Sequence, residues 1–576
     1  MDPAELDRVL RLPAAYADVV PGATEVTRIE THLSRLYFVG ARVYKVKREV
    51  DFGFVDFSTL AKRRQTCDDK VRLNRRLAPA TYLGVVPIVR GADGTIRVGG
   101  AGESGEAGEP GEKGETLEYA VEMERLPAAG MLDARLARGE IDRDVVVRLV
   151  ETLAAFHERA GRGADVDAFA TPEAIERRLL QNLDEAAAAC RRLDESMGAT
   201  TPSAPPRLLA ALRGAFTRFV RERRDLLLRR VAERRVCEGH GDLHAGNLCV
   251  IARPSGAPPD VVAFDCIEFS RALRCLDVAA DLAFLRMDLD RLGFPAFGTE
   301  LARRYAERTR DPELATLLPL YESHLAVVRA KVAALRGAGG AGGASDESSA
   351  LRQESRAVAL RYFALAVRPL LPPLVVATCG LPGSGKSAVA RAVAPPLHLL
   401  HLQADFERKL LCGLAPDAAT PPERLAEVYA PETTARTYAR LLELARVAIA
   451  RGRGALLDAT FSRADQRAAA AALARDLSAP ARPVPFVLLH CRIDDEQARR
   501  RLAARTTGPG QFSDADVAVY ERARPIFQVP DEVAPAARVD LDPATAPEEA
   551  ATAVVERALR QLETAGLPPT FRSHAV

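Results

Sequence analysis

The feature that most constrains the fold is a glycine-rich octet at residues 380–387, which reads GLPGSGKS. It follows the apolar run LVVATC and precedes a segment with helical patterning, so it joins a strand to a helix. Its glycines let backbone N–H groups turn inward around a phosphate, and the start of the helix adds the positive end of its dipole. The octet therefore predicts a phosphate-binding loop at the edge of a parallel α/β sheet.

Each polar position of this loop has an expected role. Lys386 is expected to neutralise charge on the β- and γ-phosphates of ATP, and the Ser387 hydroxyl is expected to be a ligand of Mg²⁺. The backbone of the remaining positions would surround the phosphates, at Gly380, Gly383, Ser384 and Gly385. A chance glycine-rich turn is the alternative, and the flanking strand and helix argue against it.

From residue 374 onward, strands alternate with helices, which predicts a doubly wound parallel sheet. The expected strands are 374–379, 397–402, 454–458 and 484–490, and the expected helices are 386–394, 432–451, 463–477 and 494–504. Asp405 and Asp458 are expected at the ends of the second and third strands, where such sheets bind nucleotide. An acid at such a place can hold Mg²⁺ or accept a proton from an attacking hydroxyl, and Asp458 is expected to hold Mg²⁺. Asp is also a common helix cap, which is the alternative for both residues.

A basic run, ARRRLAARTTG, follows the last of these strands. Arg501 and Arg505 share one helical face and are expected to close over the γ-phosphate of ATP, the alternative being a solvated helix face. Residues 374–530 resemble the small P-loop kinases of the gluconate kinase, polynucleotide kinase and zeta toxin group. The stretch DFERK resembles their D-x-x-R signature, which implies that Asp405 acts on the acceptor hydroxyl and that Arg408 contacts the substrate.

A second motif, HGDLHAGN, occupies residues 240–247 between short β-rich runs. Asp242 suits the base that takes a hydroxyl proton, and Asn247 suits a ligand of Mg²⁺. Asp265 is expected to end the strand VVAFD and to supply the second metal ligand. The rivals are a zinc site at His240 and His244, which needs a helix that the glycines disfavour, and a turn without catalytic function.

Upstream of this motif, residues 36–48 predict a β-hairpin in which Lys45 and Lys47 share one face. Either lysine could bind ATP, and Lys45 is preferred. The helix expected at 59–77 offers no Glu to hold that lysine, so Asp68 or Asp69 would serve or the pair would be absent. A second hairpin is expected between 81–89 and 117–126, then helices over 141–235, strands over 237–269 and helices to about 335.

Residues 30–370 resemble the aminoglycoside and choline phosphotransferase family, whose catalytic loop reads HGDxxxxN. The resemblance implies a protein-kinase-like α+β fold with a small β-rich lobe and a helical lobe. The whole layout resembles bacterial fusions of such a half with a P-loop kinase half. We expect domains at 1–371 and 372–576, divided before the first P-loop strand, with flexible insertions at 99–116 and 337–350.

Charge and cysteine usage restrict the partners and the compartment. The formal net charge is +2, from 80 basic and 78 acidic side chains, which argues against nucleic acid or an anionic membrane as a bulk partner. The first twenty residues lack the apolar centre of a signal peptide, and no apolar run reaches the ~18 residues of a membrane span. Nine cysteines without a CxxC pair predict reduced thiols in the cytoplasm.

Together these features predict two kinase modules that use ATP and Mg²⁺ to phosphorylate small hydroxylated metabolites. One alternative is that the N-terminal half binds nucleotide without turning it over and regulates the C-terminal half. Another is that the C-terminal half is a polynucleotide 5′-kinase or a zeta toxin-like kinase. No residue pattern identifies the acceptor of either module.

Overall fold

The structure is a computed structural model that describes residues 2–31, 33–51, 55–99, 115–141, 143–253, 259–339, 346–504 and 512–572. The chain divides into two compact units, described here one at a time. The first is built from residues 1–175 and 224–321, and the second from residues 176–223 and 322–574. The helical segments 176–223 and 322–371 therefore belong to the same compact unit as the phosphate-binding loop. The module boundary expected between residues 371 and 372 stays a prediction.

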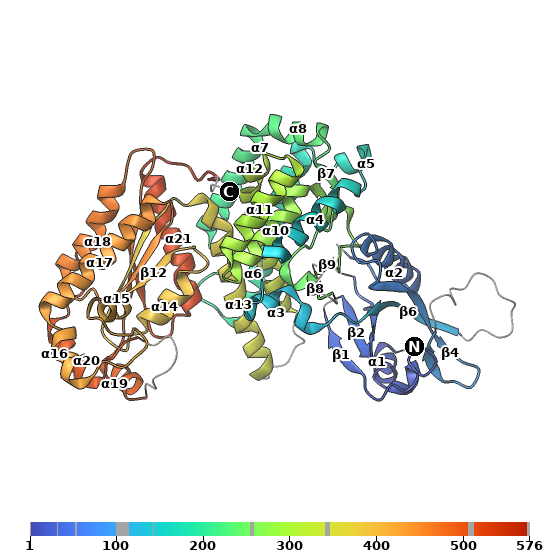
Figure 1. Ribbon diagram of the computed structural model, residues 1–576, viewed down its shortest axis with the longest axis horizontal. Helices are drawn as coiled ribbons and strands as arrows, with labels where there is room; N and C mark the ends of the chain where they lie inside the picture. The colour runs from blue at the N-terminus through green and yellow to red at the C-terminus, as the bar shows by residue number, and fades with distance from the viewer. Residues whose placement is uncertain are drawn as a thin grey trace. The chain divides into compact units, whose positions relative to one another are not determined.

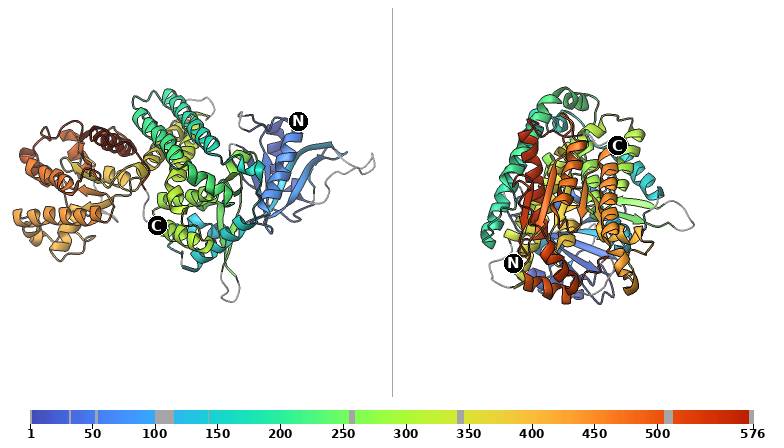
Figure 2. Two further views of the ribbon diagram at one scale, coloured as in Figure 1. Left: turned by 90° about the horizontal axis from the view of Figure 1, so that it is seen from above. Right: turned by 90° about the vertical axis from the view of Figure 1, so that its left-hand side faces the viewer.

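The first unit begins with a six-stranded antiparallel sheet in the order β1-β2-β3-β6-β4-β5, the blue part of the chain in Figures 1 and 2. The strands are β1 (Thr27–Glu30), β2 (Ser34–Val39), β3 (Arg42–Lys47), β4 (Tyr82–Arg90), β5 (Ile96–Val98) and β6 (Glu115–Glu124). Helix α1 (Pro3–Leu10) contributes Leu6 and Leu10 to one apolar cluster on this sheet, and α2 (Leu60–Asn74) contributes Cys67 and Val71 to another. The predicted first hairpin and its following helix are confirmed.

Helices and two short strand pairs complete the first unit. The helices are α3 (Leu132–Ala137), α4 (Arg143–Arg159), α5 (Ala164–Asp167), α8 (Arg224–Ala232), α9 (Arg271–Arg274), α10 (Val278–Arg291), α11 (Pro295–Thr309) and the start of α12 (Leu314–Ala338). Strand β7 (Val236–Glu238) pairs with β10 (Cys275–Asp277), and β8 (Leu248–Ile251) pairs with β9 (Asp260–Ala263). The expected β-rich lobe followed by a helical lobe is confirmed, and HGDLHAGN lies between β7 and β8.

The second unit contains a parallel five-stranded sheet in the order β12-β13-β11-β14-β15. Its strands are β11 (Val375–Cys379), β12 (Leu400–Gln403), β13 (Ala455–Asp458), β14 (Phe486–Cys491) and β15 (Arg538–Leu541). Figure 1 shows α17 (Pro431–Ala450) and α18 (Ala464–Leu477) on one face and α14 (Lys386–Val393) and α21 (Pro547–Thr564) on the other. The predicted doubly wound sheet is confirmed, and β15 and α21 extend it beyond the prediction. The remaining helices here are α15 (Ala404–Leu411), α16 (Leu425–Val428), α19 (Asp495–Ala503) and α20 (Val517–Ala523).

Further helices of the second unit come from the N-terminal half of the sequence. They are α6 (Pro172–Met197), which starts in the first unit, α7 (Pro206–Glu222), the rest of α12, and α13 (Asp346–Val367). Both α7 and α13 contact α21. Helices α12 and α13 contact each other, because Ser323 Oγ donates to the Ala366 carbonyl at 2.6 Å.

Three predictions fall wholly or partly outside the described residues: Arg505, most of the segment 99–116, and the middle of the segment 337–350. The ends of the last segment are helical, since α12 runs to Ala338 and α13 starts at Asp346. Within the ranges described, no helix is both long enough and apolar enough to cross a membrane.

Candidate functional site

The phosphate-binding loop connects β11 to α14 and takes a strained path that its glycines permit. Gly380 has φ of 147°, and a Cβ at this position would collide with the backbone of Cys491 on the neighbouring strand. Lys386 Nζ donates to the Leu381 carbonyl at 2.8 Å across the loop, and burial lowers the pKa of Lys386. Ser384 is buried, and its hydroxyl has no hydrogen-bond partner in the described part of the chain. A buried hydroxyl without a partner and a lysine at the start of a helix fit a phosphate group.

Asp458 is the last residue of β13, as expected, and lies beside the loop. His401 Nε2 is 3.1 Å from Asp458 Oδ2, and Thr378 Oγ1 is 3.4 Å from Oδ1. Burial raises the pKa of Asp458, but hydrogen bonds from His401 and Ser387 outweigh burial and leave that pKa below its ordinary value. An ionised carboxylate next to the Ser387 hydroxyl provides the oxygen ligands that Mg²⁺ prefers.

The expected substrate-side residues lie on α15. Asp405 was expected at the end of the second strand; this is wrong, because β12 ends at Gln403 and Asp405 is in the first turn of α15. Its charge nevertheless acts on Lys386. Arg408 is buried, lies 4.0 Å from Asp405 and stacks over the Tyr429 ring at 4.7 Å. The start of α15 thus places an acid and a buried guanidinium at the carboxyl edge of the sheet, where the phosphate-binding loop also begins.

Of the two lid arginines, the structure describes Arg501. Its Nη1 lies 3.5 Å from the Gly383 carbonyl and 3.7 Å from a Cβ built on Gly385. The neighbouring Arg499 turns elsewhere and pairs with Glu521 at 2.7 Å. Arg501 therefore reaches the phosphate-binding loop, among the residues of the basic run that the structure describes.

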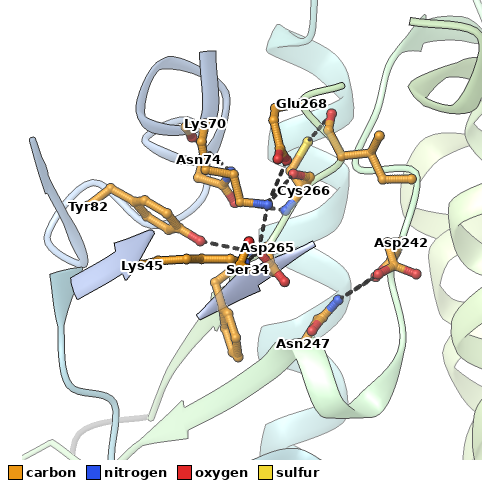
Figure 3. Close-up of polar contacts among 12 residues, drawn as sticks. Ser34, Lys45, Lys70, Asn74, Tyr82, Asp242, Asn247, Asp265, Cys266 and Glu268 are labelled. Atoms are coloured by element: carbon orange, nitrogen blue, oxygen red, sulfur yellow. Dashed lines mark hydrogen bonds and ion pairs between the residues drawn. The ribbon is translucent and has the colours of Figure 1, made fainter. Parts of the chain in front are cut away.

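In the first unit, the lysines of β3 meet two acids that follow β9, as Figure 3 shows in part. Lys45 Nζ lies 2.5 Å from Asp265 Oδ1, and Lys47 pairs with Glu268. Asp265 lies two residues beyond the end of β9, with φ of 65°, rather than at the end of the strand. The attraction of Lys45 and Lys70 outweighs burial and holds the pKa of Asp265 well below its ordinary value.

Helix α2 contributes a lysine to this cluster and no acid. Lys70 Nζ lies 2.5 Å from Asp265 Oδ1 and 2.8 Å from Glu268 Oε2, and it donates to the Cys266 carbonyl at 2.8 Å. Asp68 and Asp69, proposed as partners of Lys45, do not reach it: Asp69 pairs with Arg72 at 2.8 Å, and Asp68 is 4.0 Å from Arg64. The sequence shows no Glu on this helix. The α2 side chain that faces the site is a lysine, so the charge there is positive where an acid was expected.

The HGDLHAGN loop brings Asp242 and Asn247 together. Asn247 Nδ2 donates to the Asp242 carbonyl at 3.0 Å and to Asp242 Oδ2 at 3.2 Å (Figure 3). Asp281 of α10 holds the loop, since its carboxylate accepts from the N–H groups of His240 and Gly241 at 2.8 and 2.9 Å. His157 Nε2 lies 3.2 Å from Asp281 Oδ2 and holds this carboxylate in place. The loop is therefore held rigidly from the helical lobe.

The zinc alternative finds no support in this geometry. His240 Nε2 is 3.0 Å from the Phe264 carbonyl, and His244 Nδ1 accepts from the Gly246 N–H at 3.1 Å. The two rings are thus engaged with backbone and not with each other. No group of three or more His, Cys, Asp or Glu side chains in the described ranges is placed to hold a metal ion.

Four contributors were missed in the sequence: Lys70, Glu268, Asp281 and His401. Lys70 had a signal, because it lies on the same helical face as Cys67, Val71 and Asn74. Glu268 stands three residues after Asp265 in DCIE and could have been considered as a partner for a lysine. Nothing in the local sequence marks Asp281 or His401 out from other polar residues.

One family model matches part of the second half of the chain, and two relatives match most of the chain. Residues 375–530 match the family model described as an AAA domain, which confirms the resemblance of this segment to P-loop proteins. The uncharacterized proteins Rv2004c of Mycobacterium tuberculosis and Mb2027c of Mycobacterium bovis are each 29% identical over 499 residues, covering 86% of this chain and 89% of the relative. The similarity therefore spans both halves.

Solved structures also match each half. A gluconokinase from Sinorhizobium meliloti is 18% identical, covering 33% of this chain and 95% of its own, with a TM-score of 0.23. The GDP complex of aminoglycoside 2'-phosphotransferase-IIIa is 14% identical, covering 62% of this chain and 99% of its own, with a TM-score of 0.35. TM-scores this low leave the fold to be judged from the elements described above.

Proposed function

We propose that this protein is an ATP-dependent phosphotransferase whose P-loop module phosphorylates a hydroxyl group of a small molecule. The observation that carries the proposal is that Asp405 and Arg408 lie on α15, which directly follows β12 at the same carboxyl edge of the parallel sheet as the phosphate-binding loop. Binding and hydrolysis of ATP need the loop, Lys386 and a metal carboxylate. Asp405 and the buried guanidinium of Arg408 are not needed for binding or hydrolysis. Transfer to an acceptor alcohol uses both.

Bound Mg²⁺ would neutralise charge on the phosphates and align them for in-line transfer. Ser387 and Asp458 are the residues that would hold it, and His401 keeps the Asp458 carboxylate oriented. Lys386 would leave the Leu381 carbonyl for a phosphate oxygen, because the carbonyl is the weaker partner for an ammonium group. Asp405 would accept the proton of the acceptor hydroxyl, and Arg408 would fix the acceptor.

The test is acceptor-dependent consumption of ATP by the full chain, screened over polyols, sugars and hydroxy acids. An acceptor that raises turnover supports the proposal, and the Asp405→Asn variant should then lose the stimulated part while it still binds ATP. Stimulation that survives Asp405→Asn would contradict the role of this acid. A chain that hydrolyses ATP equally with every compound would point to an ATPase.

For the N-terminal module we propose nucleotide binding. Figure 3 shows two contacts that correspond to parts of a kinase-like site: Lys45 of β3 with Asp265, and Asn247 with Asp242. Phosphate transfer by this module would also require a bound Mg²⁺. Lys70 of α2 bears on this, because it pairs with Asp265, the expected metal ligand.

A further inference from the structure

Five ionised side chains form a cluster between β3, α2 and the segment after β9. Its members are Lys45, Lys47, Lys70, Asp265 and Glu268. Four of the five side chains are at most 11% exposed, and Asp265 is 35% exposed, so the cluster opens to solvent through that carboxylate. Three ammonium groups thus share two carboxylates in a buried place.

This count leaves one positive charge in excess. Burial lowers the pKa of Lys45, and the two neighbouring lysines add to this effect against the attraction of Asp265 and Glu268. An unbalanced charge in a poorly solvated place is unfavourable and is relieved by an anion. The cluster is therefore suited to receive negative charge.

A buried hydroxyl adds an independent sign of a missing ligand. Ser34 of β2 is 1% exposed, and its Oγ has no hydrogen-bond partner in the described ranges. It stands directly opposite Lys47 in the β2–β3 register, so both side chains lie on the same face of the sheet. A phosphate oxygen on this face would satisfy the hydroxyl and the lysines together.

The same cluster does not suit Mg²⁺. Asp265 is the expected metal ligand, yet Lys45 and Lys70 both lie 2.5 Å from its Oδ1. A divalent cation on this carboxylate would stand close to two ammonium groups and be repelled by both. With an acid at position 70 the cluster would carry a net negative charge, which would attract a cation. Lys70 is thus the residue that reverses the preference of the site.

We propose that the N-terminal module binds the triphosphate of a nucleotide directly through Lys45, Lys70 and Ser34, without a divalent cation. This deepens the nucleotide-binding role proposed above and rests on it. A module that binds the nucleotide without the metal lacks the ion that positions phosphates for transfer. It therefore serves as a nucleotide sensor in the same chain as the P-loop transferase, rather than as a second transferase.

The experiment uses the full chain carrying Lys386→Ala, which removes the main phosphate contact of the P-loop. ATP binding is titrated calorimetrically in EDTA and in excess Mg²⁺, and hydrogen exchange of peptides covering α2 and residues 262–270 locates the bound nucleotide. We expect equal affinity under both conditions, with protection of both peptides. Lys70→Glu should weaken binding in EDTA by about tenfold or more and make binding depend on Mg²⁺.

Two control variants fix the interpretation. Lys62→Glu places the same charge change at an exposed position of α2 and should leave binding in EDTA unchanged. Lys70→Gln removes the charge and keeps a polar side chain that is one atom shorter, and its affinity in EDTA should lie between those of the parent and Lys70→Glu. Binding that requires Mg²⁺ with Lys70 intact overturns the inference but leaves the nucleotide site. No protection of either peptide under both conditions overturns the nucleotide site as well, while acceptor-dependent turnover by the P-loop module is scored separately.

Discussion

The Arg356 guanidinium of α13 donates to the Glu549 carboxylate of α21 at 2.5 Å. Arg356 also donates to the Thr201 carbonyl at 2.7 Å, and its side chain is 10% exposed. Three segments that are far apart in the sequence therefore meet at one arginine. A helix that precedes the phosphate-binding loop in the sequence is thus part of the packing that covers the last helix of the chain.

This contact predicts that the P-loop domain needs α13. Leu360, Phe363 and Val367 of α13 are buried, and removing the helix exposes the apolar surface they cover. A fragment of residues 372–576 should therefore melt roughly 10 °C below a fragment of residues 346–576. Thermal denaturation followed by circular dichroism measures the difference. Equal melting temperatures would instead favour a domain boundary between residues 371 and 372.

Asp281 should be the main polar support of the HGDLHAGN loop. Asp281→Ala leaves the N–H groups of His240 and Gly241 without their acceptor and should cost about 3–5 kcal/mol in the free energy of unfolding. Urea denaturation measures this, with Asp225→Ala on the exposed side of α8 as the control that should change little.

The same side chain makes the loss depend on pH. Burial raises the pKa of Asp281, but the hydrogen bond from His157 and the nearby charges outweigh it, so the pKa is lowered. A lowered pKa means that the carboxylate stabilises the fold above the ordinary Asp value and loses this effect as pH falls through the folded value. The gap between parent and Asp281→Ala should therefore narrow in acid. A gap that stays constant down to pH 3 would assign the effect to packing.

His401 should tune the metal affinity of the P-loop module through Asp458. Removing a group that orients a metal-binding carboxylate costs about tenfold or more in metal affinity. His401→Ala should thus raise the Mg²⁺ concentration needed for half-maximal ATP turnover by about that factor. The matched control is His490→Ala, which breaks another His–Asp pair, with Asp540 at 2.8 Å, away from the expected metal ligands. Equal shifts in both variants would indicate a general loss of stability.

Lys386→Ala should lower acceptor phosphorylation by the full chain by about 10²–10³-fold, because it removes charge that stabilises the transition state. Lys331→Ala, which breaks an ion pair with Glu185 in the same unit, is the control and should keep full activity. Radiolabelled phosphate transfer to the acceptor is the measurement. Residual transfer that Asp242→Asn then abolishes would show that the N-terminal module is a transferase, against the sensor role inferred above.

The local parts of both sites were predictable because they rest on short-range rules. Strand periodicity places Lys45 and Lys47 on one face, and the loop glycines mark the strand-to-helix turn. The partners of the lysines were not predictable, since Asp265 and Glu268 lie 220 and 221 residues further along the chain from the lysines they meet. Their contact depends on how the sheet packs on the segment after β9, which no local pattern contains.

Helix α21, and the unit to which α13 belongs, were not predicted for a different reason. Helix α21 has a readable signal, with buried residues at 550, 551, 554, 555, 558, 559 and 562, the spacing of an amphipathic helix. The predicted alternation of strands and helices ends at residue 504, before α21 begins. The assignment of α13 to the unit of the P-loop had no such signal, because an amphipathic helix does not state which surface it covers.

Asp265→Asn distinguishes the two roles considered for the first unit. If Asp265 serves as a metal ligand, the substitution removes metal-binding charge and weakens the binding of Mg²⁺-ATP. If the cluster of three lysines holds the triphosphate itself, the substitution frees Lys45 and Lys70 from their shared carboxylate and strengthens the binding of ATP in EDTA.

We expect the second result, with a dissociation constant in EDTA lowered by about three- to tenfold in the chain that also carries Lys386→Ala. The substitution should at the same time lower the melting temperature without nucleotide, because two buried ammonium groups lose their anion, and added ATP should restore part of the loss. Asp69→Asn, on the exposed side of α2, is the control for removal of a negative charge and should change neither quantity. Weaker binding of ATP in EDTA by Asp265→Asn would show that the carboxylate positions the lysines for the phosphates, and the competition argued here would be wrong.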